Sequence, residues 1–442
     1  MKRLLAFCFV IMMSLTGCRS TTKTDYDQNN KKVLKIASIY ETSDLTQDIA
    51  DFKAYKGDKL DYTIELKTYA SYDDPVKSFL VDISSGKSAD IVVVPRNILY
   101  KLVNRNMVED LYQYMDSDPD LSRGDYIQSI LKAFEIKEGL YQTVSNVNLK
   151  AWVTEESEYT DPSKWSIDNF KKLIDSYPTK SVILSYSTEG IIKSMINGML
   201  NDYIDWENGE CDFNNESFYE LLDLLSYVSD HSLTIYEQNQ DTVPDAIKAD
   251  SVLFTTGIMG DYLCAYDYSK YEELYKGKTA YLGPPVVGGS STCFGWEMSQ
   301  QFSMMKASEM KNEVWDFLRF FMSRDYQKLH PEMLTSGTDW RGFPCREDCF
   351  KDYLNRYTAR SNYEYDGELV DVESDPEWIT SYTEEYAKKY REIIDRTDRV
   401  DVCDDVILNI ITDEVSAFLK GERDKKEAAN HIQDRVKIYL AE

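Results

Sequence analysis

The sequences VLKIASIY at residues 33–40 and DIVVVP at residues 90–95 decide the fold class. Both are short apolar runs rich in β-branched residues, which predicts buried strands. A third strand is predicted at 60–69 (LDYTIELKTY), and apolar residues at helical spacing over 42–55 and 75–85 predict a helix in each gap. The order strand, helix, strand, helix, strand predicts an α/β fold with a parallel sheet covered by helices. In such a sheet the ligand crevice lies beyond the carboxyl ends of the strands.

The same alternation returns after residue 141 and indicates a second unit. A chain of 442 residues also exceeds the size of one comfortable hydrophobic core, because cores stop growing beyond about 250–300 residues. The last third of the chain is predicted to be mainly helical. The predicted elements are strands at 149–153, 181–186 and 252–255, and helices at 166–176, 309–322, 404–419 and 426–440.

The N-terminal segment predicts export. Lys2 and Arg3 precede an apolar run over 4–15, which is shorter than the roughly 20 residues of a membrane-spanning helix. The run closes on Leu15-Thr16-Gly17-Cys18, which looks like the lipobox of bacterial lipoproteins, whose cysteine is acylated. We therefore expect residues 1–17 to be a lipoprotein signal peptide and residues 18–31 to be a lipidated Cys18 with a flexible polar tether. The alternative is an ordinary secretory signal with an incidental cysteine.

Composition argues against several kinds of partner and chemistry. The formal net charge of -27 disfavours nucleic acid and anionic lipid as partners and suits a neutral or cationic ligand. Three histidines, far apart in sequence, make a metal site or a histidine-based triad improbable, and no cofactor is expected. Cys345 and Cys349 are close enough to close a small disulfide loop, although free buried thiols explain them equally well.

Five segments, in this order, resemble the extracellular solute-binding proteins of ABC transporters, in particular the carbohydrate-binding group that includes maltose-binding protein. The resemblance is diffuse and extends over almost the whole chain after the tether. The segments are Ser85–Val92 (SGKSADIV), Tyr203–Trp206 with Cys211–Phe213, Tyr281–Pro285, Trp315–Phe320, and Ala417–Gly421 with Arg435–Leu440.

This resemblance implies a two-lobed periplasmic-binding-protein-like fold of type II, in which each lobe is a mostly parallel sheet flanked by helices. Three segments would cross between the lobes, near 140–146, 284–290 and 336–344. The first lobe would comprise 32–141 with 287–336, and the second 142–286 with 337–442. The resemblance further implies a non-enzymatic monomer on the extracytoplasmic face of the cell membrane, which passes a sugar or oligosaccharide to ABC transporter permease subunits.

Candidate ligand-binding residues come from two sources. The ends of the predicted strands and the first crossing place one group of polar and aromatic side chains beside the crevice: Tyr40, Glu41, Arg96, Asn97 and Asn146. The family resemblance implies a second group, on later loops and crossings: Tyr186, Glu189, Gly257, Trp296, Trp340 and Arg341. Aromatic rings cover the faces of sugars while planar polar groups bond to hydroxyls. The competing interpretation of each aromatic residue is core packing.

Two other functions remain open at this level. A surface glycoside hydrolase would also be exported and rich in aromatic residues, and it would need two carboxylates that flank a glycosidic bond. A binding lipoprotein for a peptide or polyamine would suit the acidic charge. A hydrolase would convert an oligosaccharide into shorter products, whereas a binding protein returns it unchanged. A thermal-shift screen of oligosaccharides and polyamines distinguishes a sugar-binding protein from one that binds another solute.

Overall fold

The computed structural model describes most of the chain after residue 23. The described residues are 24–40, 43–85, 89–185, 188–234, 247, 249–256, 271–272, 274–283, 285, 294–296, 301–329, 343–358, 363–365, 368–370, 384–397, 400 and 402–441.

The first sheet confirms the predicted strand and helix order. Strands β2 (Lys32–Ser38), β3 (Tyr62–Thr68) and β4 (Ile91–Val93) pair in parallel, with β2 in the middle. Helix α1 (Ser43–Lys56) and helix α2 (Pro75–Ser84) connect them. The Asp74 side chain caps α2 by accepting a hydrogen bond from the Lys77 main-chain N–H, as its place before a proline predicts. Two antiparallel strands complete this sheet: β1 (Asp25–Tyr26) and β14 (Phe302–Met304).

The second sheet has the order β10-β7-β11-β6-β12. Its parallel part consists of β10 (Leu233–Thr234), β7 (Ser181–Ser185) and β11 (Val252–Thr256), and its antiparallel part adds β6 (Trp152–Glu155) and β12 (Thr279–Leu282). The expectation of mostly parallel sheets is therefore wrong among the described strands, because each large sheet has two parallel and two antiparallel pairings.

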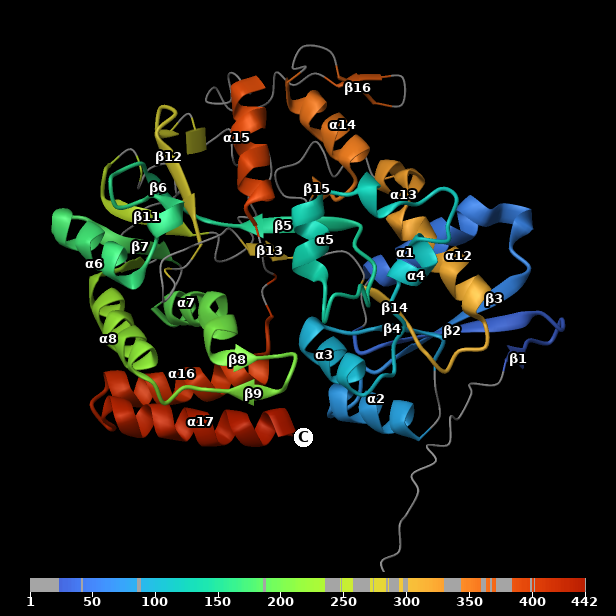
Figure 1. The fold of residues 1–442 in the computed structure, drawn as a ribbon, viewed down its shortest axis with the longest axis horizontal. Coiled ribbons are helices and arrows are strands. Elements are labelled where there is room, and N and C mark those ends of the chain that lie inside the picture. The colour runs from blue at the N-terminus through green and yellow to red at the C-terminus, as the bar shows by residue number, and fades with distance from the viewer. Residues whose placement is uncertain are drawn as a thin grey trace, which may run out of the picture.

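A third, smaller sheet joins three distant parts of the chain. Strand β5 (Asn146–Lys150) pairs antiparallel with β13 (Phe294–Trp296) and with β15 (Phe343–Pro344). Figure 1 shows this sheet between the two larger ones. The single strand predicted at 149–153 is in fact two strands, because the chain leaves β5 at Ala151 and enters the second sheet as β6.

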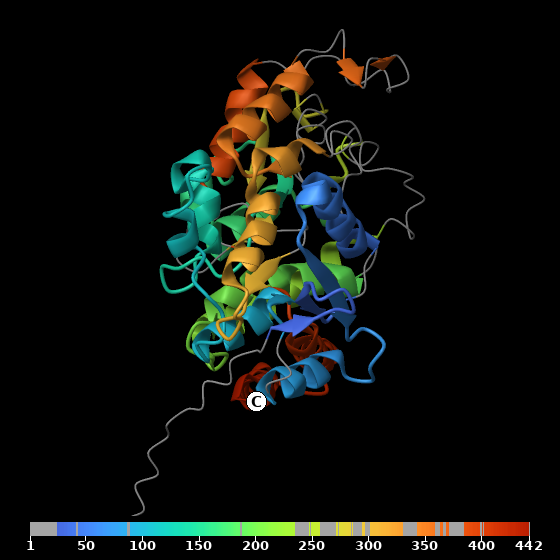
Figure 2. The same cartoon turned by 90° about the vertical axis from the view of Figure 1, so that its right-hand side faces the viewer.

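The helices divide between the sheets. We call the first sheet with its helices the first unit, and the second sheet with its helices the second unit. In the first unit, α3 (Arg96–Asn104) packs in one hydrophobic cluster with β4, and α12 (Lys311–Met322) contacts β14. In the second unit, α16 (Asp405–Leu419) contacts α7 (Thr188–Tyr203), and α17 (Lys425–Ala441) contacts α8 (Glu216–His231). The helices predicted at 309–322, 404–419 and 426–440 are thus confirmed as α12, α16 and α17. In both views α16 and α17 lie at the same end of the molecule as α2 (Figure 1, Figure 2).

The other described elements are shorter or lie beside the third sheet. Helix α15 (Glu384–Asp395) contacts α5 (Gln128–Phe134) and α14 (Glu347–Thr358), and α14 contacts β15 and α13 (Arg324–Leu329). The remaining elements are α4 (Tyr112–Met115), α6 (Ile167–Ser176), β8 (Ile204–Asp205), β9 (Glu210–Cys211), β16 (Tyr363–Tyr365) and β17 (Glu368–Val370).

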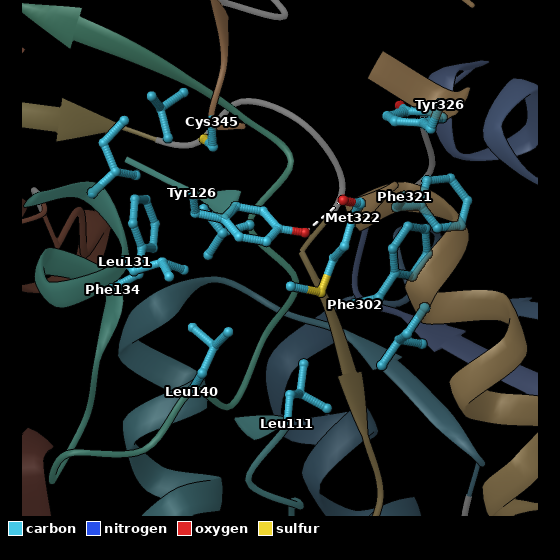
Figure 3. Packing of buried hydrophobic residues seen from close by; sticks show 14 of the residues in the cluster. Leu111, Tyr126, Leu131, Phe134, Leu140, Phe302, Phe321, Met322, Tyr326 and Cys345 are labelled. Atoms are coloured by element: carbon cyan, nitrogen blue, oxygen red, sulfur yellow. Dashed lines mark hydrogen bonds between the residues drawn. The ribbon is translucent and has the colours of Figure 1, made fainter. Parts of the chain in front are cut away.

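Tyr126 is a buried residue beside strand β15 of the third sheet. Its ring is buried in the same cluster as Phe134 and Phe302, and its hydroxyl donates a 2.5 Å hydrogen bond to the Met322 carbonyl oxygen at the end of α12 (Figure 3). The bond joins segments that are 196 residues apart in sequence. The hydroxyl therefore ties α12 to the segment that precedes α5.

Replacing Tyr126 by phenylalanine should lower the free energy of unfolding by about 1–3 kcal/mol, because the Met322 carbonyl loses a buried donor while the ring is retained. Urea denaturation of wild type and variant measures the difference. The control is Tyr26→Phe at an exposed position, which should change stability by less than about 0.5 kcal/mol. Equal effects of the two substitutions would contradict the role assigned to the Tyr126 hydroxyl.

Candidate functional site

The first unit presents two predicted site residues beyond the carboxyl ends of its parallel strands. Tyr40 follows β2 and Asn97 follows β4, and both lie beside the start of α16 in the second unit. The Asn97 side-chain amide donates a 2.6 Å hydrogen bond to an Asp404 carboxylate oxygen, Oδ2. Tyr40 is 43% exposed, but the surrounding protein partly shields its hydroxyl from water and raises its pKa to about 12, and the nearby Cys403 and Asp405 add to the shift. The structure thus brings Tyr40 and Asn97 to one place, where the two units meet.

Asp404 is the central side chain of this contact. It caps α16 with its Oδ1 atom, which accepts hydrogen bonds from the main-chain N–H groups of Val406 and Ile407. Its Oδ2 atom accepts from Asn97 and, at 3.0 Å, from the Tyr439 hydroxyl of α17. The carboxylate is only 3% exposed, and its negative charge sits at the positive end of the helix dipole. These donors and the dipole stabilise a buried charge that would otherwise be costly.

Sequence reasoning missed Asp404 as a site residue, although one signal was readable. An aspartate directly before the apolar residues of a helix predicts an N-cap. Its partner Asn97 lies 307 residues away, and no local pattern indicates that distance in space.

Further contacts join the units along α3. The Lys101 ammonium lies 4.8 Å from the centre of the Tyr439 ring. The rings of Tyr100 and Trp206 stack with their centres 6.3 Å apart and their planes at 18°. Beyond the helix, the Lys137 main-chain N–H donates a 3.0 Å hydrogen bond to Glu207. Successive side chains of α3 therefore meet three elements of the second unit: the start of α16, the end of α17 and the turn after β8.

Arg96 lines a cavity of about 630 Å³ between α3, α5 and the segment 201–212. Its guanidinium is already engaged, since it donates hydrogen bonds to the main-chain carbonyl oxygens of Phe134 and Glu135 at 3.2 and 3.1 Å. It also lies over the rings of Tyr100 and Phe134, at 5.3 and 5.4 Å from their centres. The hydrogen bonds give donors to carbonyl oxygens at the C-terminal end of α5. Ligand binding by Arg96 remains a prediction.

The remaining predicted residues are spread over other elements or lie outside the described part. Asn146 is buried at the start of β5, opposite Pro344 in the third sheet. Glu189 lies in the first turn of α7, and Trp296 ends β13. Six predicted positions lie outside the described residues: Cys18, Glu41, Tyr186, Gly257, Trp340 and Arg341.

Histidine, cysteine and acidic side chains are the groups that could hold a metal ion or react as nucleophiles. No group of three histidine, cysteine, aspartate or glutamate side chains there is arranged to hold a metal ion. Cys211 and Cys349 are free thiols, so the small loop between Cys345 and Cys349 is not closed by a disulfide. Burial and the neighbouring Asp348 raise the pKa of the Cys349 thiol to about 12, which disfavours the reactive thiolate.

The fold and the contact between units define a class: an α/β protein of two sheet-based units linked by a small third sheet, with polar side chains where the units meet. The chain belongs to a family of that class, since the model of the family described as "Bacterial extracellular solute-binding protein" matches residues 49–348. It is therefore a solute-binding protein of the ABC transporter class and not an enzyme. No curated protein sequence matches the chain.

Solved structures of the same class share the fold at low identity. A family 1 extracellular solute-binding protein from Alicyclobacillus acidocaldarius superposes with a TM-score of 0.54 at 11% identity, over 93% of this chain and 98% of that chain. The sugar-binding protein MalE from Xanthomonas citri gives 0.57 at 11% identity, over 92% and 97%. A solute-binding protein from Agrobacterium vitis with bound D-mannitol gives 0.53 at 12% identity, over 92% and 98%. The predicted α/β periplasmic-binding-protein fold is thereby confirmed at the level of the whole chain.

Among the described residues, no helix combines the length and the apolar character that crossing a membrane requires.

Proposed function

We propose that this protein captures a sugar or oligosaccharide between its two units and delivers it to the permease subunits of an ABC transporter. The match to the solute-binding family over residues 49–348 carries the proposal. The structurally similar MalE is a sugar-binding protein, and the structurally similar Agrobacterium vitis protein holds a sugar alcohol. These neighbours support carbohydrate as the solute class.

The geometry adds a place for the solute. Tyr40 and Asn97 lie beyond the carboxyl ends of parallel strands, where ligands of open α/β sheets bind. A phenol ring and a carboxamide are suited to the face and the hydroxyls of a sugar. We propose that Glu41, Asn146, Tyr186, Glu189, Gly257, Trp296, Trp340 and Arg341 complete this site, with Arg96 beside it.

The domain limits are part of the proposal. The first lobe comprises 32–141 with 287–336, and the second comprises 142–286 with 337–442. The strands β5, β13 and β15 pair in one small sheet, and in sequence they lie at or close after the ends of the three proposed crossing segments. A small sheet of this kind supports a hinge, because few residues need to change conformation when the lobes move. We further propose that the protein is a monomer held at the membrane surface by lipid on Cys18 and by the tether of residues 19–31.

A ligand screen tests the proposed function. Thermal shift with mono- and oligosaccharides, sugar alcohols, polyamines and short peptides, followed by calorimetric titration, should show saturable binding to a saccharide or sugar alcohol. A ligand that binds the folded state raises its stability by mass action, by about 2.7 kcal/mol at one hundred times its dissociation constant. Exclusive binding of a polyamine or peptide would replace the carbohydrate with that solute.

The bound saccharide should be recovered intact. Incubation of the purified protein with the oligosaccharide that it binds should release no reducing ends above a heat-denatured control, because a binding protein has no catalytic step to speed hydrolysis. Shorter products would instead indicate a glycoside hydrolase with a pair of catalytic carboxylates.

A further inference from the structure

The contact between Asn97 and Asp404 has the properties of a latch. It joins α3, whose residues Ile98 and Leu99 are buried in the first unit, to α16, whose Ile407 and Ile411 are buried in the second. Each partner is therefore fixed to the hydrophobic core of its own unit. The 2.6 Å hydrogen bond between them exists only while the two units are together.

The acceptor is preorganised before the units meet. Two main-chain N–H groups hold Oδ1 of Asp404, and the Tyr439 hydroxyl holds Oδ2 from within the second unit. The donor is held too, because the Asn97 side-chain oxygen accepts a 2.9 Å hydrogen bond from the Ile98 main-chain N–H. Formation of the contact therefore costs little side-chain entropy. A hydrogen bond to a carboxylate is also shorter and stronger than one between neutral groups.

A second interaction supports the same contact. Lys101 lies one helical turn after Asn97, and its ammonium sits 4.8 Å from the centre of the Tyr439 ring. That ring carries the hydroxyl that binds Asp404. Two neighbouring positions on one face of α3 thus bind a single cluster in the second unit, one through the carboxylate and one through the aromatic ring.

We infer that Asn97 and Lys101 of the first unit, with Asp404 and Tyr439 of the second, form a latch that stabilises the arrangement of the two units seen in the structure without solute, and we assign this arrangement as the closed one. The inference deepens the proposed function and rests on it, because it assigns part of the free energy of closure to the chain itself. For a solute that binds only the closed form, the apparent dissociation constant equals the intrinsic constant of the closed form divided by the fraction of protein that is closed. Weakening the latch therefore opens the solute-free protein and weakens solute binding together.

The test measures the opening of the solute-free protein directly. A spin label on a ketone-bearing amino acid at exposed Lys77 of α2 and another at exposed Lys420 after α16 report the distance between the units, and leave the native cysteines unlabelled. Asn97→Ala should reduce the ratio of closed to open protein about tenfold, which corresponds to about 1.4 kcal/mol. Asn97→Asp should reduce it further, because two carboxylates then face each other.

Asn104→Ala is the matched control. Asn104 lies at the other end of α3, and its side-chain oxygen accepts a 2.7 Å hydrogen bond from the Lys137 ammonium within the first unit. Its removal deletes a side-chain hydrogen bond of the same helix and leaves the main-chain hydrogen bond from Lys137 to Glu207 in place. The distance distribution of this variant should match that of wild type.

Asp404→Asn tests the latch from the other side. Asparagine is as good an N-cap as aspartate, so α16 is kept, but its amide group turns a donor toward Asn97 and Tyr439. This variant should open the protein even if Asn97→Ala folds poorly. An unchanged distance distribution in Asp404→Asn and in every folded Asn97 variant would overturn the latch, even if saccharide binds. Opening in the variants with no saccharide bound by wild type would support the latch and reject the proposed solute instead.

Discussion

Truncation of Trp165 to alanine is expected to lower the free energy of unfolding by about 3–5 kcal/mol. Trp165 is completely buried in the core of the second unit. Its ring contacts Phe170 edge-on at 5.6 Å between ring centres and Phe254 at 5.7 Å, and its indole N–H donates a 2.9 Å hydrogen bond to the Gly283 carbonyl oxygen. The substitution therefore creates a cavity, removes aromatic contacts and removes the indole donor from the Gly283 carbonyl oxygen.

The matched control is Trp315→Ala. Trp315 is only partly buried, on α12 of the first unit, and its indole N–H donates a 2.8 Å hydrogen bond to Asp118, which also pairs with Arg319. The same truncation should cost less there, on the order of 1–2 kcal/mol, because the ring is partly exposed and Asp118 keeps its ion pair with Arg319. Urea denaturation, followed by circular dichroism so that no tryptophan signal is required, measures both losses. Equal losses in the two variants would show that Trp165 is not a core anchor.

Replacement of Cys18 by serine is expected to move the protein from the membrane fraction to the soluble extracytoplasmic fraction. Under the proposed anchoring, the acyl chains on Cys18 are the attachment, since the apolar run over 4–15 is too short for a stable span. Serine accepts no thioether-linked lipid, and a membrane attachment that depends on two or more acyl chains is then lost completely.

Cys8→Ser is the control for the anchoring experiment. Cys8 lies inside the apolar run, ahead of the lipobox, so its replacement should leave the protein in the membrane fraction. Mass spectrometry of the N-terminal peptide provides a second measurement, because wild type should carry the acyl mass on residue 18 and Cys18→Ser should not. Retention of Cys18→Ser in salt-washed membranes would reject the lipid anchor.

The positions of Tyr40 and Asn97 in the candidate site could be predicted, because the ends of short apolar strands can be identified in the sequence. The apolar runs that contain β2 and β4 are short, bounded and distinct from the helices around them, so Tyr40 and Asn97 could be placed beyond the sheet from the sequence. Their common neighbours at the start of α16 could not be, since the pairing of Asn97 with Asp404 depends on how two units pack. The same limit applies to Arg96, whose hydrogen bonds to the end of α5 follow from the packing of α5 against α3.

The sequence by itself determined several of the main strands and helices and the α/β class. The alternation of apolar runs, the cap at Asp74 and the helical periods near the C-terminus are local features, and local hydrogen bonding and side-chain periodicity reproduce them in the fold. Only the tertiary structure decided that the run near residue 151 divides into β5 and β6, and that both large sheets are mixed. It also decided that Asp404 holds the two units together, through a partner 307 residues away. The physical reason is the range of the interactions: short-range preferences are encoded in neighbouring residues, whereas strand pairing and contacts between units are selected by the packing of the whole chain.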